Sequence, residues 1–265
     1  MSWQRREVEM ELFADYHTHT HHSHGRDSVE EHAHVARKKG LEEIGVADHG
    51  PASWWPVGLR GEAGWHRYRQ DCRKTDQDTD DIRVLLGIEA NVVSLKGDLD
   101  VPDAWRQELD MLLVGLHLEV WPKTWRDGSE LVINNALGAK LSPRLRRRAR
   151  NLNTKALVEC VCRHDIDIIT HPGLKLEIDT AELARTCAHR GTALEINSSH
   201  QYLQEEYITL AAKEGACFAI SSDAHCARDV GANEKGVALA RRAGLRPEQV
   251  INARGKRGGR GWRTD

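Results

Sequence analysis

Short apolar runs alternate along this chain with longer polar stretches in which apolar residues recur every three or four positions. The short runs have the length and composition of buried strands, and segments such as NTKALVECVCRH and EEYITLAAKEG have helical periodicity. This alternation is typical of repeated βα units on a parallel sheet. We distinguish seven units and predict an α/β protein, and 265 residues suit one barrel domain because such barrels need about 250.

Turn and capping residues place several boundaries. Asp27-Ser28 with Glu31 resembles a capping box, which predicts a helix from about Ser28 to Lys39 with Gly40 as its C-cap. Segment 51–68, PASWWPVGLRGEAGWHRY, is rich in Gly, Pro and Trp and is predicted to be a long loop that could act as a lid. Its Trp54, Trp55 and Trp65 are expected either to stack on a substrate ring or to seal the barrel mouth. Further strands are predicted near 82–90, 110–117, 165–171, 192–198 and 216–222, and the last helix near 229–243.

Charge and cysteine content narrow the class of protein. Lys plus Arg number 38 and Asp plus Glu 40, so the net charge of −2 predicts no polyanionic partner for the whole chain. The six cysteines form no CxxC pair and the first ten residues lack the apolar core of a signal peptide, which favours a reduced, cytoplasmic protein. No apolar run approaches the roughly 20 residues that cross a bilayer, so no membrane span is predicted.

The C-terminal end differs in composition from the rest. Residues 254–265, RGKRGGRGWRTD, are rich in Gly and Arg and have no apolar periodicity. We therefore predict a barrel domain over residues 1–253 and a disordered, solvated tail over 254–265. Contact of this basic tail with RNA or DNA is the alternative.

Polar residues stand where the apolar runs end. The runs FADYHTH, LEEIGVADHG, VLLGIEANV, MLLVGLH, IDIITHPG and CFAISSDAH carry His, Glu or Asp at or just after their C-terminal ends. A packed core would favour aliphatic residues there, because an unpaired buried polar group costs about 1–3 kcal/mol. A parallel barrel gathers these strand ends at one mouth, and residues two apart in a strand share a face. We predict a polynuclear metal site with these ligands: His17, His19, His24, His49, Glu89, His117, His171, Asp223 and His225.

Seven imidazoles and two carboxylates are enough for two or three divalent cations, with Zn–N distances of about 2.0–2.1 Å. A carboxylate such as Glu89 could bridge two of them. The ligand types suit Zn, Mn or Fe, and they leave the choice among these open.

The same residues carry a family resemblance. DYHTHTHHSHG, VADHG, GIEANV, GLH, THPG and SSDAH occur in this order across residues 15–225. In this series the chain resembles the PHP proteins, the polymerase and histidinol phosphatase superfamily of metal-dependent phosphoesterases. The resemblance implies a distorted (β/α)7 barrel with a trinuclear metal site at the C-terminal mouth of its strands.

The resemblance also implies how the ligands are divided. It assigns one ion to His17, His19, Glu89 and Asp223, a second to Glu89, His117 and His171, and a third to His24, His49 and His225. His24 departs from the pattern, since many relatives have Asp in the corresponding SxG turn. An imidazole in that place favours zinc or iron over magnesium.

The implied reaction is hydrolysis of a phosphate ester by a hydroxide that bridges metal ions, with Glu89 and Asp223 as catalytic carboxylates and Asp223 or a nearby imidazole as proton donor. Lys175, His200 and Arg228 lie on predicted mouth loops and are candidates for binding the phosphate. Asp15 and Asp48, close to ligand histidines, are expected to fix imidazole tautomers.

Three functions fit these expectations. The first is a phosphomonoesterase for a small phosphorylated substrate, as histidinol phosphatases are, and a single domain without an appended nucleic-acid module favours it. The second is a nuclease or 3′ exonuclease on single-stranded nucleic acid, which the basic tail favours. The third is a metal-stabilised binding module without turnover, which the complete ligand set argues against. The oligomeric state is left open.

Overall fold

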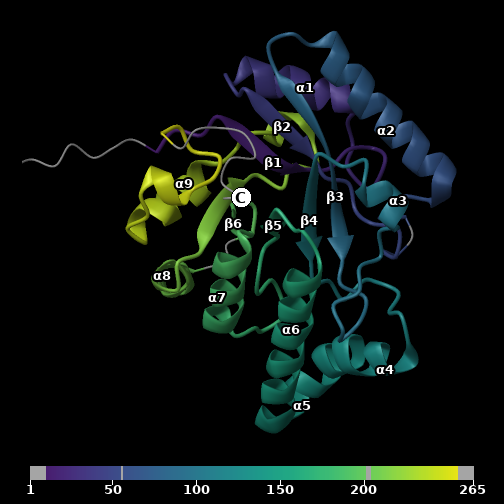
Figure 1. Ribbon diagram of the computed structural model, residues 1–265, viewed down its shortest axis with the longest axis vertical. Coiled ribbons are helices and arrows are strands. Elements are labelled where there is room, and N and C mark those ends of the chain that lie inside the picture. The colour runs from purple at the N-terminus through teal and green to yellow at the C-terminus, as the bar shows by residue number, and fades with distance from the viewer. Residues whose placement is uncertain (1–9, 55, 201–203, 256–265) are drawn as a thin grey trace, which may run out of the picture.

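Seven parallel strands form a nearly closed barrel in the computed structural model, which describes residues 10–54, 56–200 and 204–255. The strands neighbour one another in chain order, from β1 to β7, and each adjacent pair is parallel (Figure 1). A parallel bridge between Thr18 and Ala224 brings β1 back to the end of β7. The strands are β1 Ala14–Thr18, β2 Glu43–Val46, β3 Arg83–Asn91, β4 Met111–Gly115, β5 Ile168–Ile169, β6 Ala193–Asn197 and β7 Cys217–Ser221.

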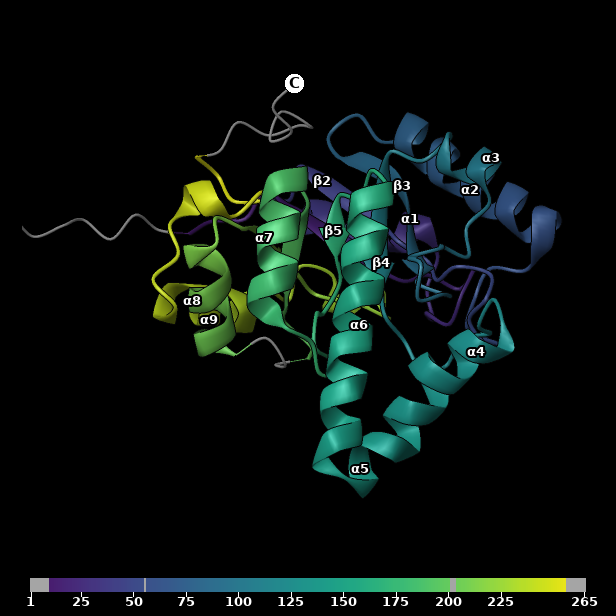
Figure 2. The ribbon, with the colours of Figure 1, turned by 60° about the horizontal axis from the view of Figure 1, so that its bottom comes forward.

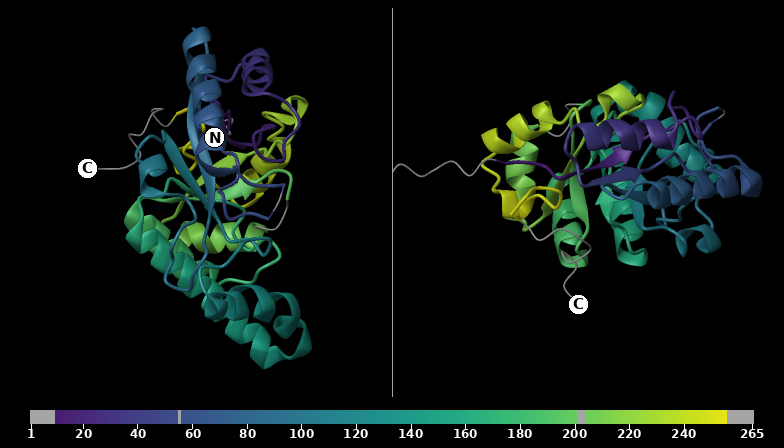
Figure 3. Two further views of the ribbon diagram at one scale, coloured as in Figure 1. Left: turned by 90° about the vertical axis from the view of Figure 1, so that its right-hand side faces the viewer. Right: turned by 90° about the horizontal axis from the view of Figure 1, so that it is seen from above.

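Helices surround the barrel, as the two views of Figure 3 show. They are α1 Val29–Lys38, α2 Gly61–Asp78, α3 Asp103–Arg106, α6 Pro143–Arg163, α7 Thr180–Arg190, α8 Glu205–Lys213 and α9 Glu234–Arg242. Short 3-10 turns lie at Ala227–Asp229 and Pro247–Gln249. The predicted α/β barrel is therefore confirmed.

Side-chain alternation along the strands divides the core into two layers. In β4, Leu112 and Val114 join the large cluster between strands and helices, whereas Met111 and Leu113 join a smaller cluster inside the barrel. Residues two apart share a face, so in β3 Glu89 points inward with Leu85. The inward face of β3 therefore carries the apolar Leu85 at the base of the barrel and the carboxylate of Glu89 at its mouth.

A register shift interrupts this alternation in β1. Its pairing with β2 is irregular between Asp15 and Thr18. Tyr16 still belongs to the inner apolar cluster, yet the next residue, His17, faces the polar mouth. Bulges of this kind commonly redirect side chains next to active sites.

Most predicted boundaries lie close to the observed ones. The capping box of α1 is present: the Ser28 hydroxyl accepts from the Glu31 amide at 3.2 Å, and the Ser28 amide donates to the Glu31 carboxylate at 2.7 Å. The later strands lie within the predicted ranges or end one residue beyond them. The last helix starts later than predicted, at Glu234, after the 3-10 turn.

The predicted long loop over 51–68 is wrong in its second half. Helix α2 begins at Gly61, and the side chain of Trp65 is only 1% exposed and stacks on Trp105 with ring centroids 5.0 Å apart. Trp65, Tyr68 and Cys72 recur at helical spacing on the buried face of α2, and this burial outweighs the two glycines. Trp54 remains partly exposed near Trp121, and Trp55 lies outside the described residues.

A helical arm between β4 and β5 is not foreseen by the sequence. It comprises α4 Trp125–Asp127, a π-helix over Gly128–Gly138 and α5 Ala139–Leu141, and it returns along α6 (Figure 2). No helix among the described residues is long and apolar enough to cross a membrane. Of the predicted tail, Arg254 pairs with Glu11 and Glu42, and residues 256–265 lie outside the described part.

Candidate metal centre

Glu89 lies at the middle of the barrel mouth and is fully buried. One carboxylate oxygen, Oε1, is 3.0 Å from His171 Nε2 and 3.4 Å from His117 Nε2. The other, Oε2, is 2.8 Å from His49 Nδ1 and 3.5 Å from His17 Nε2. Each oxygen thus faces a different group of imidazoles, which is the arrangement a bridging carboxylate needs.

Two pairs of imidazoles converge on either side of Glu89. His17 Nε2 and His19 Nε2 are 3.0 Å apart, and His117 Nε2 and His171 Nε2 are 3.4 Å apart. Asp223 Oδ1 completes the first group at 3.2 Å from His19 Nε2. Ligands of a tetrahedral zinc ion are separated by about 3.3–3.4 Å, so both pairs have a spacing that one ion could span.

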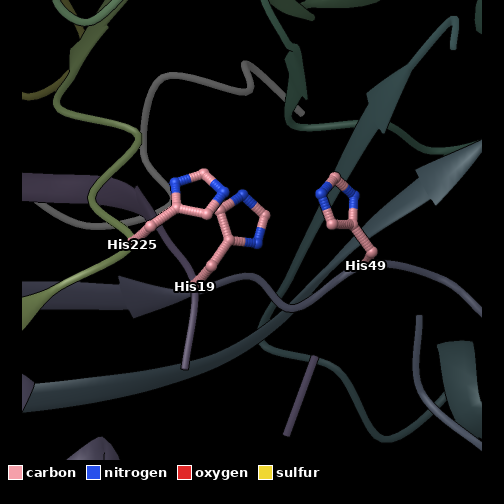
Figure 4. Close-up of side chains that lie close together, drawn as sticks. All are labelled: His19, His49 and His225. Atoms are coloured by element: carbon pink, nitrogen blue, oxygen red, sulfur yellow. The ribbon is translucent and has the colours of Figure 1, made fainter. Parts of the chain in front are cut away.

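A third group lies toward solvent. His19 comes from the end of β1, His49 follows β2 and His225 follows β7 (Figure 4). One ring nitrogen of each lies within 4.8 Å of the others. The ring of His24 is centred 4.9 Å from that of His49 and 4.3 Å from that of His225. All nine predicted residues are therefore gathered in one place, although His19 and His49 each stand between two of the groups.

Three buried atoms in this cluster have no hydrogen-bond partner: Glu89 Oε2, His19 Nδ1 and His49 Nδ1. Glu89 Oε2 and His49 Nδ1 are close, at 2.8 Å, but their orientation makes no hydrogen bond. Leaving such polar atoms buried and unpaired costs about 1–3 kcal/mol each. Divalent cations would satisfy this donor set, and the residues fit the predicted metal.

The carboxylates are held ionised. Burial would raise the pKa of Glu89, but His49 and His117 outweigh it and hold that pKa well below the ordinary value. Burial would also raise the pKa of Asp223, but His17 and His19 outweigh burial and hold that pKa well below its ordinary value. Two anionic carboxylates beside seven imidazoles form a site that favours cations.

The imidazoles differ among themselves. Burial lowers the pKa of His19, His117 and His24, with His49 adding to the shift at His19 and His24, and the pKa of His24 falls to about 4. Neutral imidazoles are the form that binds metals. At His17 and His171 burial also lowers the pKa, but neighbouring carboxylates raise it on balance, so a metal must displace protons there.

Several buried residues that hold the ligands are absent from the sequence prediction. Glu195 Oε1 is 2.7 Å from His17 Nδ1, and Glu195 Oε2 accepts from the His171 amide at 2.6 Å. Asn91 Oδ1 is 2.7 Å from His117 Nδ1, and Asn197 Nδ2 donates to Asp223 Oδ2 at 3.1 Å. The run LEINSS carries Glu195 and Asn197 two apart in β6, which is the pattern that identified the ligands elsewhere.

We expect Glu195→Gln to weaken metal binding and phosphatase turnover by about 10- to 100-fold, the usual effect of removing a partner of a metal-ligating imidazole. The amide keeps the shape but removes the charge that orients His17. The metal concentration needed for half-maximal activity should rise, and excess metal should restore most of the turnover. A purely structural role would instead lower thermal stability and leave the metal requirement unchanged.

The three predicted phosphate-binding residues occupy different surroundings. His200 Nε2 is 3.7 Å from Asp223 Oδ2, with its side chain 46% exposed, so it stands at the edge of the cluster. Lys175 is 62% exposed and lies 4.0 Å from Glu119, and Arg228 is 79% exposed beside Asp229. Among these three, in the described part of the chain, only His200 lies within 4.0 Å of a carboxylate of the cluster.

Residues with strained backbone conformations lie at the same barrel mouth. Among the described residues other than glycine, positive φ occurs at His171, Lys175 and Asp223, with values of 26°, 58° and 54°. Such conformations cost about 1–3 kcal/mol each and persist where the surroundings enforce them, commonly at functional sites.

The expected role of Asp15 and Asp48 is wrong. Asp15 accepts from the Ser222 amide at 3.1 Å and the Gly231 amide at 2.8 Å, and Asp48 accepts from the Thr20 amide at 2.8 Å. In the described part of the chain both carboxylates accept hydrogen bonds from amides and hydroxyls and not from ligand imidazoles. Both carboxylates therefore hold the loops that carry the ligands.

Comparisons with known proteins place this chain in a family and agree with its fold. The PHP domain family matches residues 15–207. A probable phosphatase of Shewanella loihica is 30% identical over 254 residues, covering 92% of this chain and 90% of that protein. A probable phosphatase of a Thermoanaerobacter species is 30% identical over 253 residues, covering 92% and 91%. This chain belongs to the PHP family, and the predicted class, a metal-dependent phosphatase, is confirmed.

A solved structure shows the same fold. It is a histidinol phosphate phosphatase from Lactococcus lactis, complexed with zinc, L-histidinol and phosphate, with a TM-score of 0.60. It is 17% identical, and the match covers 89% of this chain and 95% of that one. At this identity the likeness supports the barrel architecture alone.

Proposed function

We propose that this protein hydrolyses small phosphate monoesters at a centre of two or three divalent transition-metal ions held by Glu89 and the eight predicted ligands around it. The position of Glu89 carries this proposal, because its two buried oxygens face two separate sets of imidazoles. Zn, Mn and Fe all suit this donor set.

The protein groups have distinct roles. When bound, the metal ions would supply a nucleophile by lowering the pKa of water and would neutralise phosphoryl charge. Glu89 and Asp223 remain anionic and balance the cations, while Glu195 and Asn91 fix the rings of His17 and His117. The low pKa of Asp223 makes it a poor proton donor, so we assign it to metal binding.

His200 is the better candidate for contact with the substrate. It is partly exposed and reaches within 3.7 Å of Asp223, so its ring can meet a phosphate oxygen or the leaving oxygen at the rim. Lys175 and Arg228, exposed on neighbouring loops, remain candidates for attracting an anionic substrate.

Histidinol phosphate is the first substrate to test, because the Lactococcus structure was solved with L-histidinol and phosphate. The experiment measures phosphate release from a panel of phosphomonoesters that includes it, with a labelled single-stranded DNA in parallel. Preferential turnover of a small ester supports the proposal. Nucleotide release from DNA without any ester turnover would replace it by the nuclease alternative.

The variant for this experiment is His117→Ala. His117 contacts Glu89 at the rim rather than in the packed layers, so its loss should lower ester turnover by at least about 100-fold while the protein stays folded. His189→Ala, on the exposed face of α7, is the matched control and should retain turnover. Equal rates for wild type and His117→Ala would contradict the metal assignment.

A further inference from the structure

A second group of metal-ligating side chains lies outside the cluster around Glu89. His21 and His22 belong to the loop between β1 and α1, and Asp71 lies on α2. His22 Nε2 is 2.8 Å from Asp71 Oδ2, and the rings of His21 and His22 have centroids 4.4 Å apart. One ligand atom from each of the three residues lies within 4.8 Å of the others.

The chemistry of the three side chains suits a cation. His21 Nδ1 lies 3.3 Å from the Asp27 carbonyl, and a proton on Nδ1 leaves the Nε2 lone pair of His21 free for a ligand. The His22 side chain is 9% exposed, and its Nε2 already points at Asp71. Asp71 is half exposed, so its carboxylate can move by the roughly 0.6 Å that separates the 2.8 Å contact with His22 from a tetrahedral ligand spacing of about 3.4 Å.

This outer group is separate from the cluster around Glu89. The ring of His22 packs on the edge of Tyr68, with centroids 5.5 Å apart, and the Tyr68 hydroxyl donates to the carbonyls of Val46 and Gly87 in the barrel wall. In the described part of the chain, His22 and Asp71 form an ion pair with each other and with neither Glu89 nor Asp223.

We propose that His21, His22 and Asp71 form an outer binding site for one divalent transition-metal ion, with zinc as the favoured ion. Two imidazoles and a carboxylate leave a fourth position for water, and the partial exposure makes the site weaker than the buried centre. It adds to the nine-residue site and does not depend on the proposed phosphatase reaction.

Occupancy of the outer site would also restrain His24. His21 and His22 share the tight loop in which the Ser23 and Gly25 amides both donate to the Thr20 carbonyl. A metal ion bound to this loop and to Asp71 ties the loop to α2. His24, in the same loop, would then be held in place beside His49 and His225.

Zinc titration of the full-length protein tests the proposal. Metal-free wild type is titrated with zinc by calorimetry, and bound zinc is counted by elemental analysis after dialysis against low micromolar zinc. Asp71→Asn and His21→Ala are each expected to bind one zinc equivalent fewer than wild type, with loss of the weaker class. His66→Ala, an exposed histidine on the same helix, is the matched control and should bind as wild type.

Both variants change partly exposed side chains, so the fold should tolerate them, and circular dichroism verifies this. Equal zinc stoichiometry in wild type and both variants would overturn the outer site. The count does not use turnover, so a protein that binds the extra ion but hydrolyses no ester would refute the proposed function alone.

Discussion

Replacing Glu89 with Gln is expected to lower kcat/KM for ester hydrolysis by at least about 1,000-fold, which corresponds to about 4 kcal/mol of transition-state stabilisation. Both oxygens of Glu89 face imidazole nitrogens, and an amide offers one oxygen and turns N–H donors toward the other group. The variant should also hold less metal after dialysis. Initial rates and elemental analysis of the same preparation measure both effects.

Glu206→Gln, in the exposed first turn of α8, is the control for loss of one carboxylate. It should match wild type in rate and metal content. A Glu89→Gln protein that keeps kcat/KM within tenfold of wild type would show that Glu89 is not the central ligand.

Removing the metal is the second change with a large expected effect. Chelation should abolish turnover and lower the melting temperature by roughly 10 °C, because ligand present at 1,000 times its Kd stabilises the native state by about 4 kcal/mol. The metal-free protein retains Glu89 Oε2 and His19 Nδ1 as buried atoms without partners. Scanning calorimetry with and without chelator measures the shift, and added zinc or manganese should reverse it.

The metal requirement should depend on pH in a defined direction. The pKa values of His17 and His171 are raised in the metal-free site, where neighbouring carboxylates outweigh burial. Protons therefore compete with the metal more strongly as pH falls, and half-saturation should need more metal at pH 6 than at pH 8.

The chelation experiment has its own contradicting outcome. A melting temperature that chelation leaves unchanged, in protein that elemental analysis shows to be metal-free, would contradict the metal assignment.

The barrel and the gathering of the nine residues were predictable because the strand periodicity and the strand-end chemistry point to the same place. A parallel barrel brings all its C-terminal strand ends to one mouth, so His17 and Asp223 become neighbours despite their distance in sequence. Glu195 could have been found by the same rule, since it is a carboxylate within an apolar run. Glu195 is not one of the predicted ligands. Its carboxylate contacts the ring of His17 and accepts a hydrogen bond from the His171 amide.

Other features depend on tertiary contacts that local patterns do not reveal. Trp65 lies in a Gly-rich segment, yet stacking on Trp105 from a distant helix makes that segment helical. The register shift in β1 turns His17 toward the mouth. The residues on either side of His17 do not predict this shift. Asp15 and Asp48 accept hydrogen bonds from loop amides of distant segments, such as the Ser222 amide for Asp15 and the Thr20 amide for Asp48.

Anomalous diffraction at the zinc edge, from crystals grown with zinc, tests the metal centre most directly. We predict at least two peaks within coordination distance of Glu89, one on the side of His17 and His19 and one on the side of His117 and His171. The absence of any peak within reach of the Glu89 carboxylate would contradict a metal centre at this barrel mouth.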